Sequence, residues 1–199
     1  MLLDHTALAD SLKGYASPRA KITRMIRSGE VIQLRRGLFL EGSEKDYSLK
    51  GIAAVLYGPS YISFEYALSL YGLIPERAGA VTSATYGKNK DKVFRTPVGD
   101  FYYRYLPAAV FPYCVLRETE KGQSYLIASP EKALCDSLYK TRGADSQGRL
   151  EALLFGEWRM DEKALATLDR EAVSFLAPLY RRMPCALFAE WMKKEAGRA

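Results

Sequence analysis

The stretch SPRAKITRMIRSGEVIQLRRGLFLEG, residues 17–42, decides the fold of the amino-terminal part of the chain. Its first half predicts a helix: Ser17 suits the N-cap, Pro18 suits the first helical position, and Gly29 suits the end of the helix. Two short runs of β-prone residues then flank a turn at residues 35–37. The sequence therefore predicts a helix that leads directly into a hairpin with a basic tip.

The predicted helix has an apolar face and a basic face. Placed at intervals of about 100° per residue, Ile22, Met25 and Ile26 fall together on one side. The opposite side carries polar and basic side chains, with two further basic residues flanking it: Thr23, Arg24, Arg27 and Ser28, with Arg19 and Lys21 beside them. Such a helix packs by its apolar stripe and presents its basic face outward.

A short predicted helix, TALADSLK at residues 6–13, precedes the basic helix and the hairpin. This order is that of a winged helix-turn-helix, in which the second helix enters the major groove and the wing touches the backbone. Arg19, Thr23, Arg24 and Arg27 are candidates for base edges, and Lys21 for a phosphate. Arg35 and Arg36 at the wing tip are candidates for phosphates or the minor groove.

Two observations compete with this interpretation. A basic helix face is often merely solvated, although a second basic element directly after it favours DNA binding. A helix-turn-helix also normally has one more helix before the pair, and only residues 1–5 are left to supply it. We therefore expect the unit either to be truncated or to complete its core with a partner's surface.

Composition and charge favour an anionic partner. The chain has 199 residues with a formal net charge of +6, and residues 1–40 alone hold seven Lys and Arg against three Asp and Glu. No apolar run approaches the roughly 20 residues of a membrane span, and no secretion signal is recognisable, so we expect a cytoplasmic protein without a membrane partner. Cys114, Cys135 and Cys185 are too scattered for a disulfide framework or a zinc site.

The rest of the chain predicts a larger mixed domain. The polar segment 41–48 is the expected linker between a winged helix-turn-helix unit at 1–42 and an α+β domain at 49–199. The expected elements of the larger domain are helices at 48–58, 63–73 and 129–140, an antiparallel meander of strands at 80–87, 92–97, 100–106 and 123–129, and a helical tail with a break at Pro184. The predicted fold class is therefore α+β throughout.

Catalytic residues are not recognisable. His5 is the only histidine, and no phosphate-binding or dinucleotide glycine pattern is present. The nearest carboxylate pair, Asp169 and Glu171, would point apart on a helix and is interpreted as surface charge. We therefore predict a protein that is not an enzyme, with no catalytic residue, metal or cofactor.

A second basic cluster lies in the larger domain. Lys88, Lys90, Lys92 and Arg95 surround a Gly-Lys-Asn turn on a predicted hairpin. The cluster is a candidate contact for flanking DNA, RNA or an acidic partner. The competing interpretation is an edge hairpin whose lysines only prevent pairing with another chain.

Three segments in this order resemble the AbiEi-type antitoxins of type IV toxin-antitoxin systems. They are MIRSGEVIQLRRGLFL, YISFEYALSLYGLIPE and YLIASPEKALCDSLY. The resemblance implies a winged helix-turn-helix that represses its own operon by binding double-stranded DNA of its promoter, and a larger domain that counteracts a nucleotidyltransferase toxin. Because helix-turn-helix readers usually bind paired half-sites, we also expect a homodimer. The alternative is a protein-interaction module whose winged unit no longer binds DNA.

Overall fold

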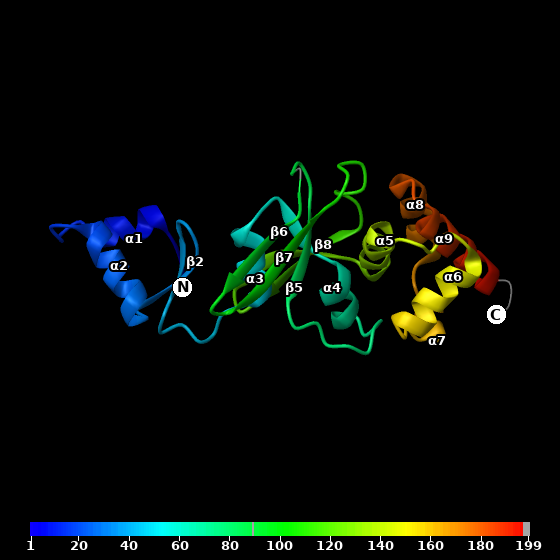
Figure 1. Cartoon of the computed structure of the whole chain (residues 1–199), viewed down its shortest axis with the longest axis horizontal. Coiled ribbons are helices and arrows are strands. Elements are labelled where there is room, and N and C mark those ends of the chain that lie inside the picture. The colour runs from blue at the N-terminus through cyan, green and yellow to red at the C-terminus, as the bar shows by residue number, and fades with distance from the viewer. Residues whose placement is uncertain (89, 197–199) are drawn as a thin grey trace.

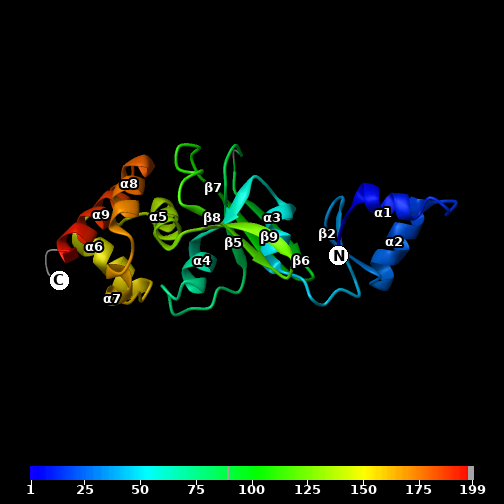
Figure 2. The same ribbon diagram turned by 180° about the vertical axis from the view of Figure 1, so that it is seen from behind.

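The computed structural model describes residues 1–88 and 90–196, and it combines helices and strands in an α+β fold. Figures 1 and 2 show three consecutive parts along the long axis: an amino-terminal unit, a central sheet and a group of carboxy-terminal helices. The N-terminus lies near the junction of the first two parts, and the C-terminus lies at the far end. The predicted α+β class is confirmed.

The amino-terminal unit combines two helices with a three-stranded sheet. Its elements in chain order are β1 (Leu2–Asp4), α1 (His5–Ser11), α2 (Pro18–Ser28), β2 (Val31–Arg35) and β3 (Leu38–Glu41). β3 lies between β1 and β2 and pairs antiparallel with both. The predicted helices and hairpin are present, and the residues before α1 form a third strand that the sequence pattern did not indicate.

Both faces of the β2–β3 hairpin are apolar, and each packs against a different part of the chain. The face toward α1 and α2 contributes Val31 and Phe39 to a small cluster with buried residues of the two helices. The other face contributes Leu34, Leu38 and Leu40 to the core of the larger region. The expected linker at 41–48 thus joins two parts that share a hydrophobic core. The surface that covers the second face of the hairpin belongs to the same chain, whereas the sequence led us to expect either a truncated unit or a partner's surface.

The larger region begins with a helix and a six-stranded sheet. These elements are α3 (Leu49–Leu56), β4 (Ser60–Ile62), α4 (Phe64–Leu70), β5 (Val81–Thr85), β6 (Lys92–Thr96), β7 (Gly99–Tyr105), β8 (Val115–Glu120) and β9 (Gln123–Ala128). The strand order is β6-β7-β5-β4-β9-β8. β6 and β8 are therefore the two edges of this sheet.

The central sheet is mixed, so the expected antiparallel meander is wrong. β4 pairs antiparallel with β5, and two antiparallel hairpins, β6–β7 and β8–β9, flank this pair. Each hairpin attaches by its second strand, and these two contacts, β5 with β7 and β4 with β9, are parallel. Local strand patterns predict hairpins, but they contain no information on how one hairpin joins another strand pair.

Helices form the carboxy-terminal part. They are α5 (Pro130–Lys140), α6 (Gln147–Glu151), a π-helix η1 (Ala152–Glu157), α7 (Glu162–Ala166), α8 (Arg170–Tyr180) and α9 (Met183–Ala196). The predicted start of α5 is confirmed, since the Ser129 hydroxyl accepts a hydrogen bond from the Lys132 amide at 3.3 Å. The break near Pro184 is also confirmed, because the chain turns between α8 and α9 just before this proline.

A buried ion pair fixes α5 between the sheet and the last helices. Lys132 and Asp136 have no exposed side-chain area, and Lys132 Nζ lies 2.7 Å from Asp136 Oδ1. The second carboxylate oxygen, Oδ2, accepts hydrogen bonds from Tyr61 on β4 at 3.0 Å and from Ser63 at 2.6 Å, while Tyr180 on α8 donates to Oδ1. The sequence pattern showed an apolar stripe on this helix, but it did not indicate that the charges are buried too.

Candidate nucleic-acid interface

Helix α2 forms where its flanking residues predict. It begins at Pro18 and ends at Gly29, whose left-handed conformation, φ 77°, suits a residue without a Cβ. Ile22 is buried, and Met25 and Ile26 are half-buried against the rest of the unit. The opposite surface is free for a partner, with four exposed candidate residues: Arg19, Thr23, Arg24 and Arg27.

An open hollow of about 950 Å³ lies between α1, α2 and the hairpin. Its apolar lining comes mainly from both helices and β3: Ala9, Pro18, Ile22, Ile26 and Phe39. Its polar lining comes from all three sides: His5, Arg19, Thr23, Gln33 and Arg36. The hollow therefore brings together side chains from His5 to Phe39, which are 34 positions apart in the sequence.

Three of the seven residues predicted to bind DNA line this hollow: Arg19, Thr23 and Arg36. Arg27 lies one turn further along α2, since Arg19, Thr23 and Arg27 occupy successive i, i+4 positions. Arg24 is exposed on the adjoining surface of the helix. The recognition residues expected from the sequence thus form one continuous surface with Arg36 of the hairpin tip.

Lys21 does not belong to this surface. Its ammonium group lies 3.4 Å from the Glu30 carboxylate and 5.7 Å from the centre of the Tyr15 ring. Hydrogen bonds from Ser28 and Lys21 lower the pKa of Glu30, so the carboxylate that holds Lys21 is ionised at neutral pH. A lysine with these partners is less available to a phosphate than the exposed arginines of α2.

Arg35 differs from Arg36 in its contacts. The Arg35 Nε donates a hydrogen bond to the carbonyl oxygen of Leu56 at 2.8 Å, and its Nη1 donates to the carbonyl of Arg36 at 3.1 Å. The first acceptor belongs to the last turn of α3, outside the amino-terminal unit. The sequence pattern predicts the same role for these two adjacent arginines, but the structure gives them different surroundings.

His5 and Gln33 also line the hollow, and the sequence patterns did not select them. The His5 amide donates to the carbonyl of Gly37 at 3.0 Å, which places this histidine beside the hairpin tip. Gln33 pairs with Phe39 across the hairpin and so shares its face. Alternation along β2 could have indicated Gln33, whereas the position of His5 depends on the pairing of β1 with β3.

The second basic cluster lies at the edge of the central sheet. Lys90, Lys92 and Arg95 are exposed and Lys88 is half-buried, while Asn89 of the predicted turn lies outside the described residues. The Lys88 ammonium lies 5.2 Å from the centre of the Tyr57 ring, and Lys92 lies 5.5 Å from that of Phe94. Both an edge-protecting and a nucleic-acid-binding role fit this position on β6.

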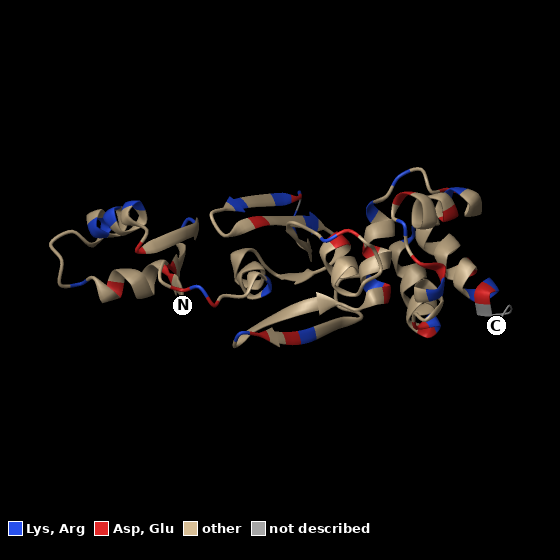
Figure 3. Ribbon diagram, turned by 90° about the horizontal axis from the view of Figure 1, so that it is seen from below, with Lys and Arg blue, Asp and Glu red and all other residues tan. Residues whose placement is uncertain are grey.

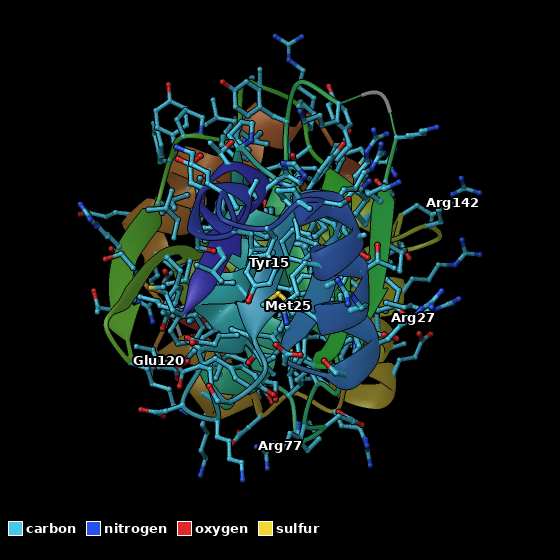
Figure 4. The ribbon with its side chains drawn as sticks, turned by 90° about the vertical axis from the view of Figure 1, so that its left-hand side faces the viewer. Tyr15, Met25, Arg27, Arg77, Glu120 and Arg142 are labelled. Atoms are coloured by element: carbon cyan, nitrogen blue, oxygen red, sulfur yellow. The ribbon has the colours of Figure 1, made fainter. Side chains whose placement is uncertain are left out.

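The basic residues of α2 and β6 share one side of the molecule. In Figure 3, the Lys and Arg positions of α2 and β6 lie along the same side, and β8, which carries Glu118 and Glu120 beside Arg117, lies along the other. Viewed along the long axis in Figure 4, Arg27 and Arg142 extend to one side and Glu120 extends to the opposite side. The basic residues of α2 and the second basic cluster therefore face the same direction.

The remaining chemical candidates have structural positions. Asp169 is the N-cap of α8, where its carboxylate accepts from the amides of Glu171 and Ala172, and both acidic residues are exposed as predicted. Cys135 and Cys185 are buried, and Cys114 is half-buried; all three are free thiols. Within residues 1–88 and 90–196, no three His, Cys, Asp or Glu side chains are grouped so that they could hold a metal ion.

Comparisons of the sequence with known proteins do not assign the chain to a family. The chain matches no model of a known protein family, and no curated protein has a similar sequence. Among the described residues, no helix has the length and apolar character required to cross a membrane.

Proposed function

We propose that this protein is a DNA-binding transcriptional repressor of its own operon and an antitoxin that counteracts a nucleotidyltransferase toxin. The DNA-binding part is supported by the arrangement of α2 and the β2–β3 hairpin. The antitoxin part rests on the resemblance of three sequence segments to the AbiEi-type family. No catalytic step belongs to this proposal.

One observation supports DNA binding above all others. Arg19 and Thr23 of α2 meet Arg36 of the hairpin around one open hollow, and Arg27 continues the row on α2. A helix of about 11 residues with one exposed polar face fits the width of a major groove. A wing arginine beside it can reach a neighbouring phosphate or the minor groove. We infer that α2 is the recognition helix and that the hairpin is the wing.

The second basic cluster extends this interface in the proposal. It faces the same side as α2, so a duplex that lies on α2 can continue toward β6. Contacts there would be to the backbone, because lysines act as point charges and carry little base preference. Homodimerisation is part of the same proposal, since paired half-sites would double the recognition surface.

The test is binding to a duplex from the protein's own promoter and to random duplexes over a series of salt concentrations. Affinity should fall steeply as the salt concentration rises. Arg27→Ala should cost about 1 to 3 kcal/mol on the preferred site and less on random DNA, if the guanidinium bonds a base edge. Equal losses on both duplexes would mean that Arg27 touches only phosphates.

A matched control is Arg117→Ala. Arg117 is also an exposed arginine, but it lies on β8, the sheet edge opposite β6. Its removal changes the net charge by the same amount and should leave DNA binding nearly unchanged. If the two variants lose affinity equally, the binding depends on net charge rather than on α2.

The runner-up is a protein-interaction module whose winged unit no longer binds DNA. It is favoured by the apolar lining of the hollow, where Ile22, Ile26 and Phe39 could receive a protein segment. This alternative predicts no retention of DNA even at low salt, together with a stable complex with another protein. Retention of promoter DNA that Arg27→Ala weakens would exclude it.

A further inference from the structure

The hairpin is attached to the larger region by more than apolar contact. Leu34, Leu38 and Leu40 lie in the larger core, so the hairpin cannot swing freely about the segment 41–48. β2 also lies against β6, and Figure 1 shows β2 as the element of the amino-terminal unit that faces the central sheet. The larger region therefore holds the wing of the proposed DNA-binding unit in place, on the face of the hairpin opposite α1 and α2.

A β-bulge turns Arg35 toward this attachment. Gln33 pairs with Phe39, but the next pair is Arg35 with Leu38, so the register shifts between residues 33 and 35. In a regular strand, Gln33 and Arg35 would point to the same face. With one extra residue in β2, Arg35 instead shares the face of Leu38, which packs into the larger core.

The acceptor for Arg35 lies at the carboxyl end of a helix. α3 ends at Leu56 and is followed by Tyr57 in an extended conformation, without a left-handed glycine to bond the last carbonyls. Two side chains bond carbonyls of this last turn: Tyr103 donates to Ala53 at 2.7 Å, and Arg35 donates to Leu56 at 2.8 Å. A guanidinium is well placed there, since the carboxyl end of a helix carries partial negative charge.

Arg35 thus joins three groups with one side chain. Its Nε bonds α3, its Nη1 bonds the carbonyl of Arg36, and its charge acts on Tyr103. Burial raises the pKa of the Tyr103 phenol and Arg35 lowers it, so the guanidinium lies within electrostatic reach of that buried ring. These contacts connect the tip of the hairpin directly to the end of α3.

We propose that Arg35 is a positioning residue that fixes the hairpin tip to the carboxyl end of α3 and so sets where Arg36 meets DNA. This inference rests on the proposed DNA binding. It divides the two adjacent arginines by role: Arg36 contacts the nucleic acid, and Arg35 holds the wing that carries Arg36. The larger region then takes part in DNA binding by orienting the wing.

Salt dependence distinguishes the two roles. A lost phosphate contact lowers the slope of log K against log salt by about 0.9, whereas a residue that acts only through Arg36 changes neither the affinity nor the slope once Arg36 has been removed. Arg36→Ala should lower the slope by about one unit. Arg35→Ala should weaken promoter binding by about threefold to tenfold, as expected for one charge-assisted hydrogen bond at a partly exposed site, and should have no further effect on the affinity or the slope when it is added to Arg36→Ala.

A conservative variant and a measurement without DNA complete the experiment. Arg35→Lys keeps one donor for the Leu56 carbonyl and should recover part of the affinity, because it cannot bond Arg36 at the same time. Amide hydrogen exchange should become faster in Arg35→Ala for peptides that cover residues 35–41 and 54–60. A peptide over β9, residues 123–128, serves as the internal control and should exchange at the wild-type rate.

Two results would overturn the inference. A further slope reduction of about one unit when Arg35→Ala is added to Arg36→Ala would make Arg35 a phosphate contact of its own. Wild-type affinity together with wild-type exchange in Arg35→Ala would show that the hydrogen bond to α3 holds nothing in place. If the wild-type protein binds no DNA, the proposed function fails, while the exchange comparison still reports separately whether Arg35 attaches the hairpin to α3.

Discussion

Replacing Lys132 by Met should destabilise the protein far more than replacing an exposed lysine on a helix, because the Lys132 ammonium is buried in an ion pair with Asp136. The change keeps an unbranched apolar side chain of nearly the same length and removes the charged ammonium group. Asp136, whose side chain is fully buried, would then keep the hydroxyl donors of Tyr61, Ser63 and Tyr180 but lose its opposite charge. Burial and the nearby Asp136 carboxylate raise the pKa of the Tyr61 and Tyr180 phenols, so both continue to donate rather than ionise.

The expected magnitude follows from leaving one charge buried without its partner. Removing one member of a buried ion pair costs about 3 to 5 kcal/mol. That is a large part of the roughly 5 to 15 kcal/mol by which a protein is normally stable. At about 2 to 4 °C per kcal/mol for a chain of this size, the midpoint of thermal unfolding should fall by about 6 to 20 °C.

The exposed pair of Asp145 and Arg149 supplies a matched control. It has the same i, i+4 spacing and distances of 2.8 and 3.0 Å, but its side chains are 62% and 66% exposed. Arg149→Met should cost no more than about 0.5 kcal/mol, because water screens such pairs. The free energies of unfolding from urea titrations of both variants provide the comparison.

Near-equal losses in the two variants would refute the reasoning, since they would show that burial adds nothing to the pair. A double variant, Lys132→Met with Asp136→Asn, gives a second check. Because it removes both charges and keeps a carbonyl oxygen for the hydroxyl donors, it should be less destabilised than Lys132→Met alone. A double variant at least as unstable as the single one would contradict an unpaired buried carboxylate as the cause.

Two further predictions concern the antitoxin role and the thiols. An adjacent reading frame that encodes a nucleotidyltransferase toxin would allow the first test. A variant with Arg19→Ala and Arg36→Ala should lose promoter binding and still relieve the toxin's growth arrest, because the larger region carries the proposed antitoxin activity. If the toxin stays fully active beside this variant, the assignment of antitoxin activity to the larger region is wrong. A thiol reagent should label Cys114 first in the native protein and all three cysteines only after unfolding. The reason is that burial raises the pKa of the Cys185 thiol to about 12 and that of the Cys135 thiol well above its usual value. The labelling rate of Cys114 should keep rising to a higher pH than that of a free cysteine, because burial raises its pKa as well, and rapid native labelling of all three would disprove this order.

Local signals in the sequence were sufficient for the elements of the candidate site. Pro18 and Gly29 mark the ends of α2, and the spacing of Ile22 and Ile26 separates its packed side from its basic side. The turn between β2 and β3 is equally local, since β-prone runs flank a glycine. These features depend on backbone preferences and on helical periodicity, which act over a few residues and are therefore readable without tertiary structure.

Contacts between distant segments decided everything that this local pattern left open. Arg35 and Arg36 are adjacent in the sequence, and only the bulge in β2 and the position of Leu56 give them different partners. The mixed order of the central sheet and the burial of Lys132 likewise depend on which surfaces meet across many residues. Burial of apolar surface stabilises any arrangement that covers the same faces, because the hydrophobic effect has no direction. The sequence therefore determined which faces must be covered, and the packing of the folded chain determined which segments cover them.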